Sequence, residues 1–445
     1  MNIVRSFSDR IRWMFFPRTI LDASSKCPLV KLHNWDYLLF VSEPDLVKQI
    51  NKATGSIFLG GKGNEFLGSL LGQQSVFLLD GEKHKLARTL VSKAIGTDKV
   101  NKNKTKLKET IRCFVEDIEK KNRFDLTSTI RRLTFQISAS FVFPQNNPQL
   151  ESELFKRIEK TTGLLANLVS YNRKFWYPIG KISVGHVVKM YVERIDQLIY
   201  EQIDRVKNRT IENKNPSSLI EILVSEQSVY HYNDGFIRDN IVSVLTAGYD
   251  TTGSALSWIC FWYSKLSDDE ILELRNREQY NNSSNKLLSS FISECLRYCS
   301  PIEILPRKIS LSNTEHRDKA HSIINSQYIK SHDTKTLMEN DGIVAVCPYA
   351  VHHNEAIYKE PYKFDRMRFV DKQYKPHEYF PFGASARYCL GADLGYSILE
   401  EFVRLLLLKK KTIKIRKVMK YKPVRRNVSL WPGYSIPAQI VQMAL

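Results

Sequence analysis

The sequence predicts a mainly α-helical protein with smaller β-sheets. Three stretches carry this prediction: helical spacing of apolar residues through most of 106–226, a long helical pattern from Ile237 to about Leu266, and an apolar stripe at i+4 spacing that begins with Leu394. The composition, 43% hydrophobic and 11% aromatic, is sufficient to bury a large core, and no Gly/Ser-rich or Pro-rich linker divides the chain. We therefore expect one domain over residues 1–445, without internal repeats.

The charge balance suggests what kind of partner the protein binds. Lys and Arg number 66 against 47 Asp and Glu, which gives a formal net charge of +19. Such an excess suits nucleic acid, an anionic membrane or an acidic protein. Because the basic residues are dispersed rather than gathered in one run, we expect no nucleic-acid binding and favour an acidic protein partner.

The cysteines and the N-terminus indicate the cellular setting. Seven cysteines form no CxxC pair and no zinc-like array, and their odd number argues against a disulfide framework, so we expect a cytoplasmic protein. The N-terminal segment 1–25 holds a short apolar run, Ile11 to Phe16, which is interrupted by Arg12 and too short to span a bilayer. We expect no transmembrane anchor. The run either packs on the protein body, which we favour, or rests peripherally on a membrane surface.

Residues 60–91 combine a glycine-rich loop, a strand-like run SVFLL and a helix that is expected to begin at Asp80. On that helix, His84 and Arg88 are four residues apart and share a face. A histidine beside an arginine suits a carboxylate or a phosphate, since arginine can donate two parallel hydrogen bonds. Taken alone, such a pair is most often an ordinary solvated helix face.

The helical region 106–226 carries no recognisable chemistry. Polar breaks near Gln145 and Asn172 divide it into several helices. The Asn- and Lys-rich stretch 207–217 is short enough to be a surface loop between two of them.

The long helix 237–266 has an unusual centre, AGYDTT, from Ala247 to Thr252. Glycine costs helix stability, and threonine hydroxyls compete for backbone carbonyls. One explanation is that a small ligand lies against the backbone here while an acid and an alcohol, Asp250 and Thr251, relay protons. A packing kink is the alternative. It explains Gly248 but not the adjoining acid and alcohol.

A pair of charged residues follows downstream. Glu294 and Arg297 are three residues apart and are neighbours on one helical face, and Arg368 in the later segment FDRMRF is a candidate third partner. By itself this spacing is a weak signal. Beyond it, Pro301 and Pro306 enforce extended chain.

The segment 382–391, FGASARYCLG, places Cys389 where a loop becomes a helix. The positive end of the helix dipole and the unsatisfied amide protons there favour the thiolate, which is the form that binds metal. Arg387 adds a cation that can hold an anion, and the small residues 383–385 allow close approach of a flat ligand. The alternative is that Cys389 is only a small buried apolar residue.

These motifs together resemble the cytochrome P450 family. The order F-x-x-x-x-R-x-C-x-G is similar to its haem-ligand loop, AGYDTT to its oxygen-binding motif, D-G-E-x-H-x-x-x-R to a propionate-binding segment of bacterial members, and the ExxR and FDRMRF segments to its supporting charge network. They occur in the family's order across nearly the whole chain. The run SVFLLDGEKHK looks particularly like a bacterial branch that hydroxylates fatty acids and terpenoids.

The resemblance implies a P450 fold in which haem b lies between the Asp250 helix and the Cys389 helix, with Cys389 as the axial iron ligand. It also implies that Asp250 and Thr251 activate oxygen and that a mobile lid covers the substrate. The residues implied for haem binding are Cys389, His84, Arg88, Arg307, Arg387, Phe382 and Ala247; for the charge network, Glu294, Arg297 and Arg368; for the substrate pocket, Ile302, Ile304 and Trp431; and for the lid, Leu164, Leu165, Leu168 and Phe175. For Trp431, a surface turn aromatic is an equal alternative.

The chain departs from the family pattern at several positions. Ser385 stands where the family has Gly or Asp, in a position that glycine fits more easily, and Arg366 replaces a proline that shapes a turn. Gly395 and Ile398 replace an alanine and a glutamate. Residues 308–341 are long and polar for the hairpin expected there, and we expect an exposed insertion of about a dozen residues.

The function that the resemblance implies is a monooxygenase. Such an enzyme inserts one atom of dioxygen into an apolar small molecule (a fatty acid, terpenoid or natural-product intermediate) and receives electrons from a separate ferredoxin or flavodoxin-type donor. The lysines expected to attract an acidic donor are Lys83, Lys85, Lys372 and Lys375. Two alternatives stay open: a peroxide-driven peroxygenase, against which the Asp250 and Thr251 pair argues, and a non-catalytic haem or hydrophobic-ligand binding protein, which the departures suggest.

Overall fold

The computed structural model describes residues 21–22, 29–31, 38–145, 147–163, 184–209, 216–280, 286–310, 314–324, 342–415, 423–426 and 428–443. The four residues expected in the lid, nearly all of the N-terminal segment and most of 308–341 lie outside these ranges, so those predictions stay predictions.

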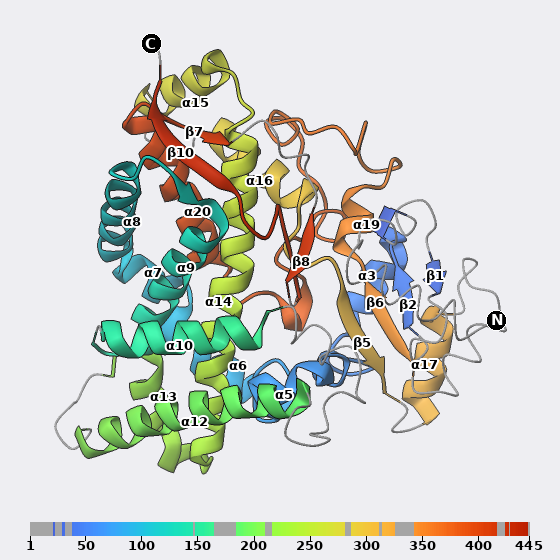
Figure 1. Ribbon diagram of the computed structural model, residues 1–445. Coiled ribbons are helices and arrows are strands. Elements are labelled where there is room, and N and C mark those ends of the chain that lie inside the picture. The colour runs from blue at the N-terminus through green and yellow to red at the C-terminus, as the bar shows by residue number, and fades with distance from the viewer. Residues whose placement is uncertain are drawn as a thin grey trace.

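The described chain is mainly helical with small sheets, which confirms the predicted fold class (Figure 1). The helices are α3 (Pro44–Lys52), α4 (Gly60–Gly63), α5 (Gly68–Leu71), α6 (Gly81–Ile95), α7 (Thr97–Lys102), α8 (Lys104–Glu119), α9 (Leu126–Val142), α10 (Pro148–Thr161), α12 (Val184–Arg209), α13 (Leu219–Tyr230), α14 (Asp234–Tyr263), α15 (Asp268–Tyr280), α16 (Lys286–Tyr298), α17 (Thr314–Ile324), α19 (Pro348–His352) and α20 (Ala392–Leu408).

The strands form three small sheets. They are β1 (Leu29–Lys31), β2 (Leu38–Val41), β3 (Phe58–Leu59), β4 (Phe124–Asp125), β5 (Leu305–Ile309), β6 (Ile343–Val346), β7 (Lys411–Ile415), β8 (Val424–Arg426), β9 (Ser429–Trp431) and β10 (Pro437–Gln442). One sheet has the order β1-β2-β6-β5-β3, in which β2 and β6 are parallel and the other neighbours antiparallel. A second has the order β4-β10-β7, and β8 pairs with β9 as a hairpin.

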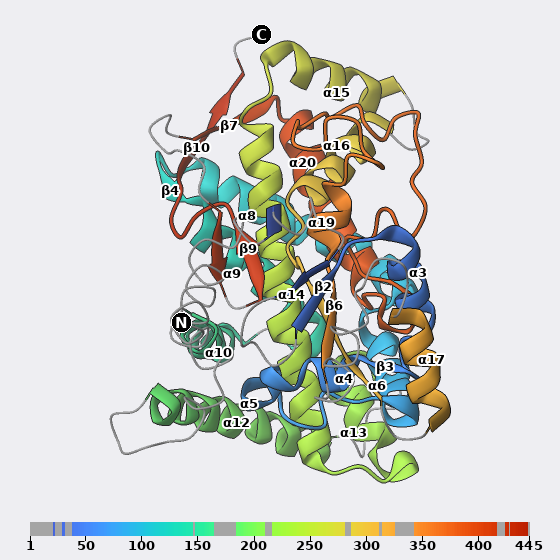
Figure 2. The same ribbon diagram turned by 90° about the vertical axis from the view of Figure 1, so that its right-hand side faces the viewer.

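Helix α14 organises the molecule. It begins at Asp234, three residues before the predicted Ile237, and the side chain of Asn233 at its N-cap accepts a hydrogen bond from the Phe236 amide. It runs through the middle of the protein, with helices on one side and the five-stranded sheet on the other (Figures 1 and 2). Because its sequence is apolar on nearly all sides, it is buried over most of its length.

The prediction of a strand at SVFLL is wrong. Residues 75–79 form turns, and their polar groups are satisfied by side chains of α14 rather than by a neighbouring strand. The Val76 amide donates to Asn240 Oδ1 at 2.9 Å, and the hydroxyls of Ser75 and Ser243 lie 2.6 Å apart. The helix predicted to follow is confirmed, since α6 begins at Gly81 with Asp80 as its N-cap residue.

The region 308–341 contains α17, which lies between the neighbouring strands β5 and β6 in sequence and packs near α3. Ala320 and Ile324 of α17 are buried in an apolar cluster with residues of α3 and the five-stranded sheet. This helix is therefore amphipathic rather than uniformly exposed.

In the described ranges, no helix combines the length and the apolar character needed to cross a bilayer.

Candidate active site

The cysteine loop is closed by backbone hydrogen bonds. The Cys389 amide donates to the Phe382 carbonyl at 2.9 Å, and the Gly383 amide donates to the Phe380 carbonyl at 3.0 Å. Helix α20 begins at Ala392, shortly after Cys389, which is the position that the sequence predicts. The loop therefore presents Cys389 on a defined turn at the start of a buried helix.

Ser385 in this loop adopts φ of +54°, a conformation that favours glycine. The expectation that serine strains this position is confirmed. We expect Ser385→Gly to raise the free energy of unfolding by about 0.5–1 kcal/mol, because it removes the left-handed penalty of a residue with a Cβ. Urea denaturation would measure the change. Its matched control is Ala384→Gly, at φ of −150°, where glycine should instead be destabilising; a gain from both substitutions would contradict the argument.

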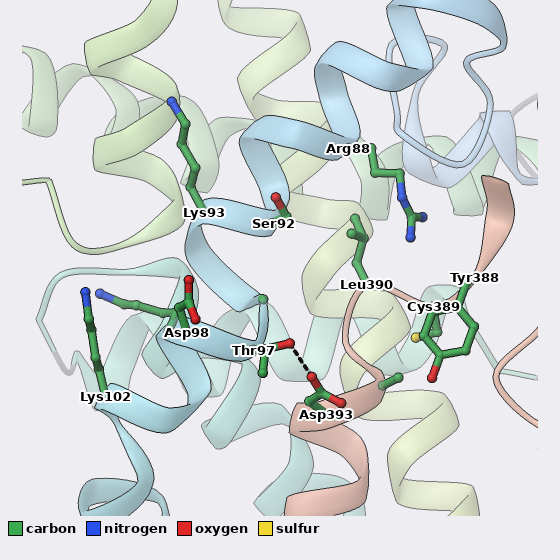
Figure 3. A pocket seen from close by; sticks show the side chains of 13 residues that line it. Arg88, Ser92, Lys93, Thr97, Asp98, Lys102, Tyr388, Cys389, Leu390 and Asp393 are labelled. Atoms are coloured by element: carbon green, nitrogen blue, oxygen red, sulfur yellow. Dashed lines mark hydrogen bonds between the residues drawn. The ribbon is translucent and has the colours of Figure 1, made fainter. Parts of the chain in front are cut away.

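A pocket of about 730 Å³ opens beside Cys389. Figure 3 shows Arg88 of α6 directed toward the loop that carries Tyr388 and Cys389. The pocket is lined by Arg88, Ser92, Lys93, Gly96, Thr97, Asp98, Lys99, Lys102, Tyr388, Cys389, Leu390, Ala392 and Asp393. Cys389 is exposed to solvent, so the alternative that it is a buried apolar residue is wrong.

The ionisation of the Cys389 thiol differs from the expectation. Surrounding protein raises the pKa of this thiol above its ordinary value, whereas the Gly391 amide and Arg88 lower it. The backbone amide and the nearby cation thus lower the pKa of the thiol, as predicted, but removal of the sulfur from water raises this pKa by more. The helix terminus alone does not produce a thiolate here, and a bound metal cation would have to supply the remaining stabilisation.

Three buried basic residues gather around Asp80. Burial, Arg387 and Arg88 lower the pKa of His84 to about 4, and burial and Arg387 lower the pKa of Arg307 to about 10. The Nε atoms of Arg307 and Arg387 are buried and have no hydrogen-bond partner among the described residues. An excess of buried positive charge with unpartnered N–H groups fits a ligand that carries carboxylates.

Arg387 is more occupied than the sequence suggested. Its Nη2 lies 2.5 Å from Asp80 Oδ1 and also donates to the Leu79 carbonyl, while its Nη1 donates to the Val76 carbonyl at 3.2 Å. Only Nε stays available to an anion. The sequence analysis missed Asp80, which also accepts from the amides of Gly61 and Lys62. Its place directly before α6 did not indicate this role, because its side chain makes no capping hydrogen bond to that helix.

One face of α14 is open at its centre. From Phe236 to Cys260 the helix is buried except at Ala247, Gly248, Thr251 and Thr252, which are half-exposed and share a face. This face lies near the cysteine loop, since a Cβ built on Gly395 of α20 would be 3.8 Å from Thr252 Oγ1 and 3.7 Å from Phe382.

The two explanations for AGYDTT both hold in part. A Cβ at Gly248 would lie 2.2 Å from Ser138 Oγ, so glycine here permits close approach of α9, as the packing alternative proposed. Thr251 lies on the open face, where its hydroxyl donates to the Ala247 carbonyl at 2.7 Å.

Asp250 points elsewhere. It is buried, and its Oδ2 accepts a 2.6 Å hydrogen bond from the Ser429 hydroxyl of β9. Burial raises the pKa of Asp250 to about 6, although Ser429, Arg131 and Arg426 act to lower it. The carboxyl is therefore poised to exchange a proton near neutral pH. Nothing in the local sequence indicated Ser429.

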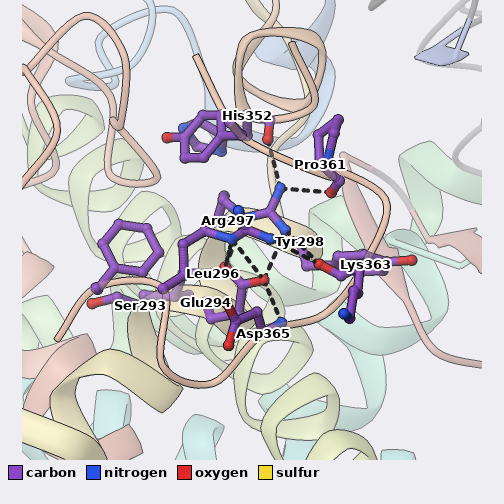
Figure 4. A network of polar contacts seen from close by, with 12 residues as sticks. Ser293, Glu294, Leu296, Arg297, Tyr298, His352, Pro361, Lys363 and Asp365 are labelled. Atoms are coloured by element: carbon purple, nitrogen blue, oxygen red, sulfur yellow. Dashed lines mark hydrogen bonds and ion pairs between the residues drawn. The ribbon is translucent and has the colours of Figure 1, made fainter. Parts of the chain in front are cut away.

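The structure brings Glu294, Arg297 and Arg368 together. Figure 4 shows Glu294 and Arg297 at the centre of the network. Arg297 donates two hydrogen bonds to the Glu294 carboxylate, at 2.7 and 2.8 Å, and two more to the carbonyls of His352 and Pro361. Arg368 Nε lies 3.1 Å from the same carboxylate. Glu294 and Arg297 are completely buried, so each charge depends on its partners.

The replacement of proline by Arg366 does not abolish the turn. The Arg368 amide donates to the Asp365 carbonyl at 3.1 Å, and Ser290 of α16 holds the Arg366 carbonyl. The Arg366 guanidinium pairs with Glu270 and Glu273 of α15, at 3.0 and 2.7 Å. The arginine thus attaches the segment to α15 in place of the rigidity that proline would supply.

The residues expected in the substrate pocket have different surroundings. Ile302 and Ile304 lie half-buried in extended chain before β5, and Ile304 contacts a small cluster that includes Phe40. Trp431 is completely buried against α14, where a Cβ on Gly253 would lie 2.9 Å from its ring. The alternative of a surface turn aromatic is wrong, because β9 pairs with β8 and packs directly on α14.

These features test whether haem fits. The site offers an accessible thiol, a strip of small and hydroxyl-bearing positions on the neighbouring helix, and buried guanidinium N–H groups without partners. An iron porphyrin with two carboxylates matches all three features: the thiol can bind the iron, the small positions leave room for a flat ring, and the N–H groups can donate to the carboxylates. Fold and site together define a haem-thiolate protein.

Comparison with known proteins identifies the family. The sequence model of the family "Cytochrome P450" matches residues 27–431, so the chain belongs to the cytochrome P450 family. The putative cytochrome P450 135B1 of Mycobacterium tuberculosis is 22% identical over 386 residues, covering 83% of this chain and 75% of that protein. Human cytochrome P450 4Z1 is 23% identical over 369 residues, and the alignment covers 74% of this chain and 68% of the human protein.

Solved structures share the fold. Retinoic acid-bound cyanobacterial CYP120A1 superposes with a TM-score of 0.76 at 18% identity, covering 94% of this chain and 92% of that one. CYP109E1 from Bacillus megaterium in complex with testosterone gives 0.71 at 16% identity, covering 97% and 98%. The protein is accordingly a haem b-dependent monooxygenase that uses dioxygen, a substrate and a redox partner.

Proposed function

We propose that this protein oxidises an apolar small molecule, with Cys389 as the iron ligand and electrons from a separate ferredoxin or flavodoxin-type protein. The observation that carries the proposal is the placement of an accessible Cys389 beside the open face of α14, which carries Ala247 and Thr251. When bound, haem b supplies the chemistry that reduces dioxygen and transfers one oxygen atom to the substrate.

The chain's own residues position the reaction. Cys389 would hold the iron, and Arg307 and Arg387 would bind the propionates through their Nε–H groups, which have no partner among the described residues; Arg88 and His84 of α6 would bind beside them. The small side chain of Ala247 leaves room for the porphyrin. Phe382 packs beside Gly395 of α20 and supports the cysteine loop.

Proton handling falls to two residues of α14. The Thr251 hydroxyl lies on the open face and accepts or donates a hydrogen bond there once it releases the Ala247 carbonyl. Asp250 holds a proton in its buried carboxyl close to neutral pH. Glu294, Arg297 and Arg368 act indirectly, by fixing the chain that leads into the cysteine loop.

The substrate class is proposed to be a fatty acid, a terpenoid or a similarly apolar natural-product intermediate. Ile302 and Ile304, which precede β5, contribute apolar surface. The support from structural relatives is indirect: one is bound to retinoic acid, another is in complex with testosterone, and P450BioI is in complex with an acyl carrier protein that carries hexadec-9Z-enoic acid. All three ligands are largely hydrocarbon.

The surface beside Cys389 suits an acidic electron donor. Lys93, Lys99 and Lys102 line the pocket that reaches Cys389, and none of the three was among the lysines expected from sequence. Of those, Lys85 pairs with Glu82 and Lys375 lies 3.9 Å from Glu378, so part of their charge is already compensated.

We expect Lys99→Gln with Lys102→Gln to slow electron transfer roughly tenfold at low ionic strength, because the steering field weakens. The difference should shrink as salt is added. Stopped-flow reduction by a ferredoxin at several salt concentrations measures it. The control Lys48→Gln with Lys52→Gln makes the same charge change on exposed positions of α3; an equal effect there would show that only net charge matters.

The function is tested by the absorption spectrum of the dithionite-reduced protein with and without carbon monoxide. We expect a strongly red-shifted, thiolate-type Soret band that disappears in Cys389→Ala and persists in Cys113→Ala, which removes another exposed cysteine. A histidine-type band, or no haem, would contradict the proposal. Product formation driven by hydrogen peroxide alone would instead favour the peroxygenase alternative.

A further inference from the structure

Two neighbouring residues of the AGYDTT motif serve different sides of α14. Thr251 belongs to the half-exposed face with Ala247, Gly248 and Thr252. Asp250 is 2% exposed and lies about 100° around the helix from Thr251, on the buried side with Gly253, Ser254 and Ser257. An acid that supplies protons to the open face must therefore do so from a position that turns away from it.

The side that Asp250 faces is the β8–β9 hairpin. Ser254 Oγ and Trp258 Nε1 of α14 both donate to the Leu430 carbonyl, at 2.6 and 2.7 Å, and Gly253 allows the Trp431 ring to lie directly on the helix. Ser429, next to Leu430, is completely buried. Its hydroxyl donates to Asp250 Oδ2 at 2.6 Å, and this bond holds the carboxyl on the hairpin side, where the Trp431 side chain also acts to lower its pKa.

The hairpin is also attached to the chain that precedes β5. The Leu430 amide donates to the Pro301 carbonyl at 3.0 Å, and Arg425 of β8 forms a buried ion pair with Glu303, also at 3.0 Å. The same hairpin thus contacts both the acid and the segment proposed to line the substrate pocket.

Charged residues of neighbouring elements surround the Asp250 carboxyl. Arg131 of α9 and Arg426 of β8 lower the pKa of the Asp250 carboxyl. The charge of Asp250 in turn raises the pKa of Tyr249. Arg131 Nη1 lies 2.5 Å from Glu159 of α10, and the Glu159 side chain is 35% exposed. The groups that face Asp250 from α9 and β8 are therefore cations, and one of them, Arg131, also pairs with the partly exposed Glu159.

We infer that Ser429 is a positioning residue for the acid of this enzyme: its hydroxyl holds the Asp250 carboxyl on the hairpin side of α14 and thereby fixes where that acid stands relative to the open face. The inference rests on the proposed function, because it takes Asp250 as the proton donor. Each proton that leaves the carboxyl turns it into a carboxylate, and one proton from solvent restores the acid. Only O–H bonds form and break.

The first test is a direct titration of Asp250 in the ferric haem-loaded protein. Infrared difference spectroscopy follows the protonated-carboxyl band, which is identified by its absence in Asp250→Asn. Because the hydroxyl stabilises the carboxylate, its removal should favour the protonated acid. We expect the midpoint to rise by about 0.5–1 pH unit in Ser429→Ala and in Ser429→Cys, which is closer to serine in volume, and to return to within about 0.3 unit of the original in Ser429→Thr.

The second test links this titration to turnover. With dodecanoic acid as the probe substrate and a ferredoxin system as donor, the fraction of electrons released as hydrogen peroxide is measured between pH 5.5 and 8. In Ser429→Ala, the pH dependence of this fraction should shift to higher pH by the same amount as the infrared midpoint. In an Asp250→Asn background, Ser429→Ala should have no further effect.

The inference is overturned if both Ser429→Ala and Ser429→Cys leave the infrared midpoint unchanged, or if Ser429→Ala shifts the pH profile equally when Asp250 is absent. If dodecanoic acid is not oxidised, the infrared titration alone decides. Absence of the thiolate-type carbon monoxide spectrum in the unsubstituted protein would instead count against the proposed function, so the two failures are distinguishable.

Discussion

Glu294→Gln is expected to lower the free energy of unfolding by about 3–5 kcal/mol, because it leaves the buried Arg297 guanidinium without its anion. The substitution keeps the size of the side chain and removes only its charge. Arg297 would retain the carbonyls of His352 and Pro361, which do not neutralise it. Arg368, also held by Glu294, would lose its carboxylate as well. Urea denaturation measures the loss, and haem retention during the titration shows whether the cysteine loop follows.

The matched control is Glu273→Gln, which removes a carboxylate from another Arg–Glu pair. Glu273 lies 2.7 Å from Arg366, but its side chain is 38% exposed. Water can solvate both charges there, so the cost should stay below about 1 kcal/mol. Equal losses from the two substitutions would show that Glu294 is an ordinary ion-pair partner rather than the centre of a buried network.

The second large effect concerns Asp250 and pH. Its pKa in the folded protein is about 6 against an ordinary 3.8, so the carboxyl is more easily ionised in the unfolded chain. The stability it contributes is fully present below pH 3.8 and is lost as pH rises through 6, about 3 kcal/mol in total and roughly 1.4 kcal/mol of it between pH 5 and 7. The difference in unfolding free energy between the unsubstituted protein and Asp250→Asn should therefore fall as pH rises from 5 to 7.

Asp125→Asn provides a control of opposite sign. Burial tends to raise the pKa of Asp125, but hydrogen bonds from Ser435, Ser128 and Thr127 lower it overall. Its stabilising contribution is fully present above its ordinary pKa of 3.8 and is lost on acidification below that value, so this difference should stay level from pH 5 to 7 and fall below about pH 4. Parallel slopes for the two substitutions would contradict the burial argument for Asp250.

The site residues that could be predicted are those whose neighbours lie within a few positions of them along the chain. The helix after Cys389, the helix that carries His84 and Arg88, and the contact between Glu294 and Arg297 follow from spacings of three to four residues, which a helix converts directly into proximity. The order of the motifs along the chain indicated the family, and the family implied haem b as the cofactor.

Residues whose roles depend on distant segments were not predictable in the same way. Asp80 and Arg387 meet across 307 positions, and Ser429 and Asp250 across 179. The lysines on the pocket that reaches Cys389 belong to α6 and α7, whose placement against α20 no local pattern states.

The sequence by itself determined the mainly helical fold class, the starts of α6 and α20, the presence of the long helix α14, and the family, because periodicity, capping residues and motif spacing act over short distances along the chain. Only the tertiary structure decided that SVFLL is a loop held by α14, that Trp431 is buried, and that Asp250 faces a hairpin while Thr251 faces the open side. A helical pattern specifies which residues share a face. Which partner covers that face depends on long-range packing of the whole chain.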